Sequence, residues 1–472
     1  MIQRLHFSTS LKSLAGAASV LLLAGCATLS TDGGSEAVSA LTRERIGEPV
    51  RRAASEADFS TTEAAVDALL ARPLTAESAI RIALLNNRAL QASFAELGVA
   101  EADMVQAGRL RNPGFSFSRL RNGEDIEIER SIMFDLVGLL TMPVRSNIER
   151  GRYEATKLRV ATDAVRLAAD TRRAYFNAVA AQQTALYMEQ AKEAAEAGAE
   201  LGQRMAKAGN WSKLDVAREQ AFYADATAQL ARARHQATAT REQLTRLLGL
   251  WGKRATFELP ERLPELPKAP REIREIEADA MRQRLDVQMA KLDAEAAASA
   301  LGLTRATGFI NVFHAGYINK SETGDPRSNG YEIELELPLF DWGGAKTAKA
   351  EALYMQSVHR TAEIAIRARS QVREAYSAYR TSYDLARHYR DEVVPLRKKI
   401  SEEMLLRYNG MLVGVFELLA DARTQIASVN AAIEAQRDYW LADSDLQMAI
   451  TGNGGMAMEL RAAPAAAEQQ GH

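Results

Sequence analysis

The chain has 472 residues, of which 47% are hydrophobic, 25% are charged and 6% are aromatic, and its formal net charge is −2. Such a chain is too apolar to be disordered, and it lacks the basic excess typical of nucleic-acid-binding proteins. One cysteine and six scattered histidines exclude a disulfide framework and a multi-cysteine zinc site. The composition therefore points to no metal site, no cofactor and no catalytic residues.

The N-terminus is typical of an exported protein. Basic residues precede a short apolar run at residues 14–23, which is too short to span a bilayer as a helix. The run ends in Leu23-Ala24-Gly25-Cys26, which resembles a bacterial lipobox. This resemblance implies that residues 1–25 are a signal peptide, that Cys26 is the lipidated N-terminus and that the protein is sorted to the outer membrane. The alternative is an ordinary signal peptide that happens to contain a cysteine.

Long helices account for most of the first half of the chain. After a tether or linker over residues 26–73, a helix is expected at about 76–107. No proline occurs between residues 144 and 259, and this interval is rich in strong helix formers, so it predicts a helix over about 145–207. A turn then leads to a second helix, which is capped by Ser212 and ends at about 248. Helices this long are typical of coiled coils and helical repeats.

The second half repeats this pattern after a proline-rich linker at residues 251–272. Helices are expected at about 273–303, 345–407 and, after a break at residues 408–410, up to about 450. Pro395 is expected to kink the middle one of these helices.

Matching residues support a duplication. Arg172 and Tyr175 recur as Arg373 and Tyr376, at an offset of 201 residues. The chain is thus predicted to consist of two divergent repeats and a flexible tail, at residues 74–250, 273–451 and 452–472.

Each repeat also contains a pair of strand-like segments. Residues 115–120 and 126–134 flank an Asn-Gly turn and form a hairpin within about 113–136. Residues 309–318 and 331–339 flank a polar loop and form a second hairpin within about 308–340. These segments approach the length of a tilted membrane-spanning strand, although half-buried strands of a soluble sheet would alternate in the same way. Arg130 falls among the apolar positions, and residues 309–318 alternate poorly.

Four strands cannot close a barrel, and open sheet edges are not tolerated in lipid. Closure would therefore need several copies of the chain. Two copies would give a bore filled by side chains, whereas three copies would give about twelve strands and leave a passage.

The order of these elements, together with local motifs, resembles the TolC-type outer-membrane efflux channels, in the lipoprotein branch that serves pumps of the RND class. The matching segments are ALLNNRALQA (83–92), GRLRNPGFSFS (108–118), ELPLFDWGGAK (336–346) and RYNGMLVGVFELLADAR (407–423). Arg88 and Leu285 stand where proline is common in the family.

The resemblance implies a mainly helical chain with membrane strands that forms a homotrimer, with a twelve-stranded β-barrel above an α-helical barrel. It also implies a non-enzymatic exit duct in the outer membrane that extends into the periplasm. Such a duct receives drugs, solvents or metal cations from an inner-membrane pump and a periplasmic adaptor. The alternatives are an adaptor lipoprotein, whose single helical hairpin fits this chain poorly, and an envelope enzyme.

Several residues become candidates for sites in such a duct. If the apolar positions of the strands face lipid, the barrel lumen carries Glu127, Glu129, Glu332, Glu334 and Glu336. The long helices reverse at two tips, where the resemblance implies adaptor docking: Gly209, Asn210, Trp211 and Ser212, and Gly410, Met411, Leu412, Val413 and Gly414.

Acidic residues beside the tips are candidates for a periplasmic gate. The family's D-V-L-D pattern appears as residues 417–420, with Glu417 in place of the first acid and no second acid. Asp421 lies one position later, and Asp215 is the counterpart of Glu417 in the first repeat, where it could instead cap its helix. Arg407 and Arg423 are candidate counter-charges for these acids.

Overall fold

The computed structural model describes residues 28–308 and 312–452. The predicted signal peptide, Cys26 and residues 453–472 of the predicted tail lie outside these ranges. Among the described residues, no helix is both long enough and apolar enough to cross a membrane.

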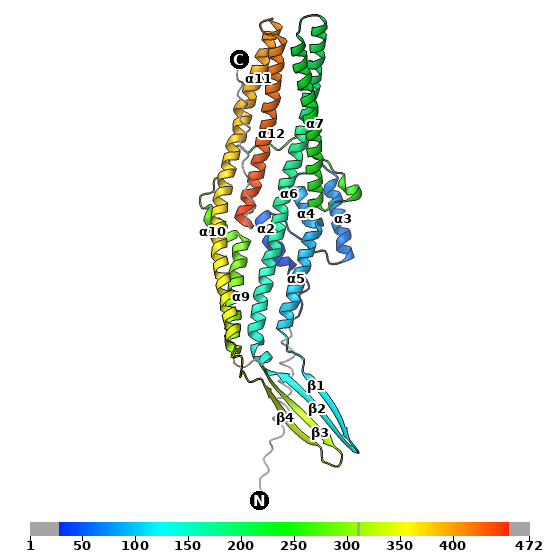
Figure 1. The fold of residues 1–472 in the computed structure, drawn as a ribbon, viewed down its shortest axis with the longest axis vertical. Helices are drawn as coiled ribbons and strands as arrows, with labels where there is room; N and C mark the ends of the chain where they lie inside the picture. Colours follow the sequence, from blue (N-terminus) through cyan, green and yellow to red (C-terminus); the bar gives the residue numbers. More distant parts are fainter. Residues whose placement is uncertain (1–27, 309–311, 453–472) are drawn as a thin grey trace. The chain divides into compact units, whose positions relative to one another are not determined.

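The described elements occur twice in the same order (Figure 1). The first repeat contains α4 (Ala76–Asn86), α5 (Arg88–Ala107), β1 (Gly114–Asn122), β2 (Asp125–Asp135), α6 (Leu136–Lys207) and α7 (Lys213–Leu248). The second contains α8 (Ile276–Gln283), α9 (Leu285–Thr307), β3 (Phe313–Glu322), β4 (Ser328–Leu335), α10 (Gly344–His388), the π-helical turn η2 (Tyr389–Val393), α11 (Val394–Asn409) and α12 (Val415–Thr451). The predicted duplication is therefore confirmed.

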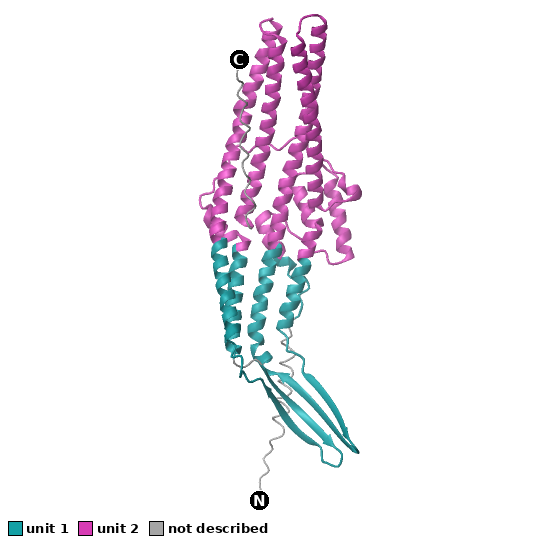
Figure 2. Ribbon diagram, in the orientation of Figure 1, with its two compact units in different colours: residues 1–37, 94–160, 287–364 teal, residues 38–93, 161–286, 365–472 magenta. Residues whose placement is uncertain are grey.

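The chain divides into two compact units (Figure 2). Unit 1 comprises residues 1–37, 94–160 and 287–364, of which residues 28–37, 94–160, 287–308 and 312–364 are described. Unit 2 comprises residues 38–93, 161–286 and 365–472 and is described up to residue 452.

Unit 1 contains a four-stranded antiparallel sheet in the order β1-β2-β3-β4. Strands β3 and β4 extend further into the predicted polar loop than expected, where Asn319 donates a hydrogen bond of 2.7 Å to Asn329 across the pair. Strand β4 ends at Leu335, four residues before its predicted end, and Pro338 follows, which has no N–H to donate to a ladder.

Helix α6 begins nine residues before its predicted start and includes Pro143. Its beginning is capped by the Asp135 side chain, which accepts a hydrogen bond of 2.7 Å from the Gly138 backbone N–H. This cap explains the earlier start, because it satisfies one of the free N–H groups of the first turn.

The single helices predicted at 76–107 and 273–303 are each broken once, at Asn87 and Arg284. Both residues have extended ψ angles, 120° and 123°, and stand directly before Arg88 and Leu285. Each helix is therefore broken directly before the position where proline is common in the resembling family, although this chain has no proline there. The irregularity expected near Pro395 takes the form of η2, one π-helical turn that precedes it.

Most of the two segments predicted as linkers is folded into unit 2, while residues 28–37 belong to unit 1. Residues 26–73 contain α2 (Ser35–Ile46) and α3 (Glu56–Leu70), and Val66 of α3 is 1% exposed within the core. In the proline-rich segment, Leu259 and Leu263 are buried in the same core. The Trp440 indole of α12 donates a hydrogen bond of 3.0 Å to the carbonyl of Pro264. Tertiary packing therefore orders both segments, whether they are helical, as in α3, or non-helical, as around Leu259.

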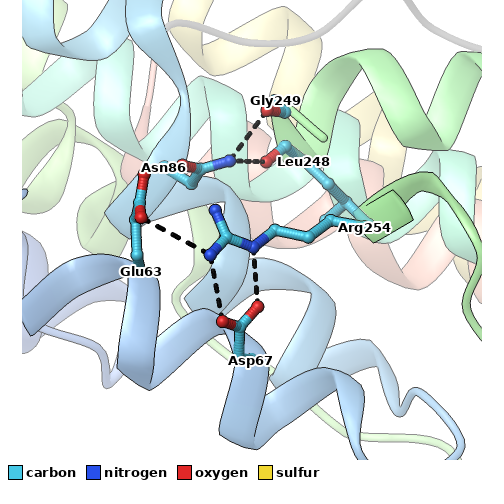
Figure 3. A network of polar contacts seen from close by, with 6 residues as sticks. All are labelled: Glu63, Asp67, Asn86, Leu248, Gly249 and Arg254. Carbon is cyan, nitrogen blue, oxygen red and sulfur yellow. Dashed lines mark hydrogen bonds and ion pairs between the residues drawn. The ribbon is translucent and has the colours of Figure 1, made fainter. Parts of the chain in front are cut away.

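A polar network joins α3, α4 and the end of α7 in unit 2 (Figure 3). The Arg254 guanidinium binds both carboxylate oxygens of Asp67, at 2.6 and 3.0 Å. The Asn86 side chain donates to the carbonyls of Leu248 and Gly249, at 3.0 and 2.8 Å. These bonds satisfy the last carbonyls of α7.

We expect Gly249→Ala to lower the free energy of unfolding by about 1–3 kcal/mol. Gly249 has a φ of +66°, and a Cβ there would lie 2.8 Å from the backbone oxygen of Asn86. Thermal unfolding measures the effect. Gly98→Ala in α5 is the matched control, because a Cβ there meets nothing within 4 Å and should stabilise the helix slightly. Equal midpoints for the two variants would contradict the prediction.

Candidate functional site

The register of the sheet places the predicted strand acids on one face. Directly paired residues of antiparallel strands point to the same side. Glu127 pairs with Glu322, Glu129 with Lys320, and Lys320 with Ser328. The same parity places Glu332 and Glu334 of β4 on this side. The backbone N–H of Glu336 still donates to Val312, at 3.4 Å, just beyond the end of β4. We call this side the acidic face.

The acidic face also contains two basic residues that the sequence analysis did not single out, Lys320 and His314. The Lys320 ammonium lies 2.5 Å from a carboxylate oxygen of Glu127. The His314 ring lies 2.9 Å from the carboxylate of Glu334. Both come from β3, whose poor alternation concealed which residues share a face. The face is therefore mainly acidic, with Lys320 placed among Glu127, Glu129 and Glu322.

The opposite face of the sheet is mainly apolar, although Arg119 and Arg121 of β1 also lie on it. Its exposed residues include Phe115, Phe117, Ile132, Phe134, Tyr317, Tyr331 and Ile333. Arg130, the exception in the sequence pattern, lies on this face with its guanidinium 6.0 Å from the centre of the Phe117 ring. It also donates a hydrogen bond of 3.1 Å to the Asn319 side chain. These contacts along one row of the sheet accommodate the charge.

At the first helical turn, Gly209 has a φ of +81° and Ser212 caps α7. The Ser212 hydroxyl accepts from the Asp215 backbone N–H at 3.2 Å and donates to the Asp215 carboxylate at 2.7 Å. Ser212 is therefore the N-cap, and Asp215 completes a capping box with it, which is the capping role that the sequence left open as an alternative for Asp215. Trp211 packs back on α6, since a Cβ at Gly202 would lie 2.8 Å from its ring.

At the second turn, the left-handed residue is Met411, with a φ of +57°, while Gly410 has an ordinary φ of −81°. Met411 and Leu412 are 94% and 77% exposed, and Val413 is half-buried. Gly414 is the N-cap of α12, and the carboxylate of Glu417 lies 2.9 Å from the position of a Cβ on Gly414. The two turns are thus equivalent in sequence position but not in backbone conformation.

The two helical hairpins meet near these turns through a buried ion pair. Glu219 of α7 is 1% exposed, and its carboxylate lies 2.6 Å from the guanidinium of Arg423 of α12. That guanidinium also lies 4.4 Å from the centre of the Phe222 ring. The second carboxylate oxygen of Glu219 and Nε of Arg423 have no hydrogen-bond partner among the described residues.

Asp421 is buried beside this pair, at 9% exposure, and its Oδ2 also has no partner among the described residues. The helices approach closely here, because a Cβ on Gly198 of α6 would lie 3.3 Å from Leu419 of α12. The arginines predicted as counter-charges do not pair with the predicted gate acids. Arg423 pairs with Glu219, and Arg407 donates to Glu403 one turn away on α11, at 3.0 Å.

Residues 79–250 match the family model described as outer membrane efflux protein. Over these residues the chain is similar to the outer membrane efflux protein family. This finding supports the channel interpretation of the sequence and an outer-membrane location, and it does not support the adaptor alternative.

Solved outer-membrane channels have the same fold as this chain. The CmeC channel of Campylobacter jejuni is 15% identical and has a TM-score of 0.69, with 89% of this chain and 93% of that chain covered. VceC of Vibrio cholerae is 16% identical with a TM-score of 0.67, covering 80% and 96%. The open state of MtrE from Neisseria gonorrhoeae is 18% identical with a TM-score of 0.64, covering 80% and 89%. Among curated protein sequences, none matches.

Glu219 is the site residue that sequence reasoning missed. It lies four residues after Asp215, as Asp421 lies four residues after Glu417. Each repeat therefore has one acid in the first turn of its helix and a second, buried acid one turn later. This spacing was present in the sequence, but only the partner Arg423, 204 residues away, distinguishes Glu219 from an ordinary surface glutamate.

Proposed function

We propose that three copies of this chain assemble into the exit duct of a tripartite system. The observation that carries the proposal is a four-stranded sheet with one apolar face, one acidic face and two unpaired edges, β1 and β4. Open edges are not tolerated in lipid. Three such sheets close into a barrel of about twelve strands that leaves a passage, with the apolar face toward lipid.

The partners follow from the same assignment. We propose a periplasmic adaptor and an inner-membrane pump of the RND class, with drugs, solvents or metal cations as solutes. Lipidation of Cys26 would add an anchor to the outer membrane. The family is one of channels rather than enzymes. No group of three His, Cys, Asp or Glu side chains in the described ranges is arranged to hold a metal ion.

The two helical turns are the proposed docking sites for the adaptor. Gly209, Asn210, Trp211 and Ser212 form the first, and residues 410–414 form the second. The second turn offers the larger apolar surface, because Met411 and Leu412 are almost fully exposed, whereas Trp211 is folded against α6. Glu417, Asp215, Asp421 and the Glu219–Arg423 pair lie next to these turns in the sequence, where we propose that the duct closes.

The acidic face should make the open duct cation-selective. Rings of one charge sign inside a low-dielectric wall favour counter-ions at low salt. In planar bilayers, the protein should form pores that prefer cations, and the triple variant Glu332→Gln/Glu334→Gln/Glu336→Gln should lower the cation-to-anion permeability ratio by about twofold or more. Lys320→Gln should shift the ratio in the opposite direction, because it removes the lysine of the acidic face.

These recordings also test the function itself. A protein that inserts as a trimer but passes no ions would contradict the duct. Pores that prefer anions, or a triple variant with unchanged selectivity, would contradict only the lumen assignment.

A further inference from the structure

Unit 1 contains two cavities next to the sheet, of about 670 and 530 Å³. Arg152, Ala300 and Thr304 line both of them, so the two cavities are adjacent. Each lies within the 300–1,000 Å³ typical of sites for small molecules. We call the two cavities together the basic groove.

One face of each helix lines the basic groove. Helix α6 contributes Arg145, Ile148, Glu149 and Arg152, whose spacing of three, four and seven residues places them on a single stripe. Helix α10 contributes residues 346, 349, 350 and 353 with the same spacing. Helix α9 and the end of α5 complete the lining. The lining of the groove therefore comes from the faces of several helices rather than from a gap between two side chains.

Cations dominate the lining: Arg109, Arg111, Arg145, Arg152, Lys346 and Lys349. The acids are fewer: Asp103, Glu149 and Asp293. Burial raises the pKa of Asp293 above its usual range, although the charge of Arg159 opposes the shift. The groove therefore has a net positive charge.

Much of this positive charge is available to a ligand. Arg152 is paired with Glu149 at 2.6 Å, and Arg111 with Asp135 at 3.2 Å. No ion pair within the described ranges involves Arg109, Lys346 or Lys349. Nε of Arg145 is buried and has no hydrogen-bond partner among those residues. A buried donor without a partner is costly, and an anion would satisfy it.

The remainder of the lining is apolar. Ile148, which is 7% exposed, and Leu303 line the first cavity, and Leu353 and several alanines of α9 and α10 line the second. A hydrophobic body therefore fits the floor of the groove, while the arginines and lysines suit a carboxylate or sulfonate.

An ion pair connects the groove to the acidic face. The groove residue Arg111 pairs with Asp135, and the register pairs Asp135 with His314, which in turn pairs with Glu334.

We propose that the basic groove binds amphipathic organic anions, in which an apolar ring system bears one sulfonate or carboxylate group. The claim that such anions are transported rests on the proposed duct, whereas their binding does not. An anionic lipid headgroup has related chemistry, and the experiment below separates it from a soluble solute.

The test is calorimetric titration of the full-length trimer, in nanodiscs of phosphatidylcholine, with naphthalene-2-sulfonate. The uncharged naphthalene-2-sulfonamide is the matched ligand, and empty nanodiscs give the background. We expect the sulfonate to bind at least about tenfold more tightly than the sulfonamide, because charge-assisted hydrogen bonds carry the difference. Arg145→Gln/Arg152→Gln should lose about tenfold or more in sulfonate affinity.

Lys346→Gln/Lys349→Gln provides a second variant if the arginine variant fails to assemble, and it should also weaken binding. Arg119→Gln/Arg121→Gln on β1 removes the same charge outside the groove and should bind normally. Equal affinity for the two ligands, or equal losses in groove and control variants, would overturn the proposal. Displacement of the sulfonate by added phosphatidylglycerol would also overturn it, by assigning the groove to lipid. If the binding test fails in this way but the protein still forms conducting pores in planar bilayers, the proposed duct stands and only the binding proposal is wrong.

Discussion

Arg423→Ala should open the periplasmic end of the isolated channel and increase its conductance in planar bilayers. The substitution leaves the carboxylate of Glu219, which is 1% exposed, buried without a counter-charge between α7 and α12. Breaking a fully buried pair costs about 3–5 kcal/mol, and less is expected here because the Arg423 side chain is 31% exposed. The two hairpins should then separate more easily, and cells should become sensitive to large antibiotics that the outer membrane normally excludes.

Two variants make this prediction specific. Glu219→Met/Arg423→Met should restore closure, because apolar side chains can replace a buried ion pair at little cost. Arg234→Ala breaks the exposed pair with Glu189 between α7 and α6, whose side chains are 60% and 46% exposed, and should change little. If Arg423→Ala leaves conductance unchanged, the pair does not hold the channel closed. Glu417→Ala should then show whether the exposed acid beside the turn does so instead.

Met411→Asp/Leu412→Asp should abolish efflux while leaving the trimer and its conductance intact. Both side chains are already exposed, at 94% and 77%, so charge at these positions costs little folding energy. At an interface, however, two desolvated carboxylates would oppose an apolar contact with the adaptor. The measurement is drug susceptibility of cells that depend on this channel, together with oligomeric state and single-channel recordings of the purified variant.

Met411→Leu/Leu412→Met is the control, since it keeps the apolar surface and should pump normally. Substitutions of the turn glycines refine the result. A bulky side chain at Gly414 would displace Glu417, whereas Gly410 has an ordinary φ and no neighbour closer than 3.5 Å to a Cβ. We therefore expect Gly414→Leu to impair efflux more than Gly410→Ala. Normal efflux by the double aspartate variant would exclude the second turn as a docking site.

The sequence by itself determined the order of the elements, because hydrophobic periodicity and helix-breaking residues such as glycine and proline act over a few residues. The proline-free interval and the residues around Gly209 and Gly410 predicted the helix reversals. Alternation predicted that Glu332, Glu334 and Glu336 share a face. Local patterns also anticipated that Asp215 could cap its helix, which the Ser212 hydroxyl confirms.

Other features depended on the tertiary structure, because their partners are far apart in the sequence. Glu219 and Arg423 are 204 residues apart, and only packing of the two repeats removes their charges from water. Lys320 and Glu127 meet only through the register between β2 and β3. The segment at residues 26–73 is helical because Val66 is buried in a core formed by distant helices, although its own sequence indicated a tether. Local propensity predicts secondary structure poorly wherever burial against distant residues contributes more stabilising free energy than the propensity of the segment itself.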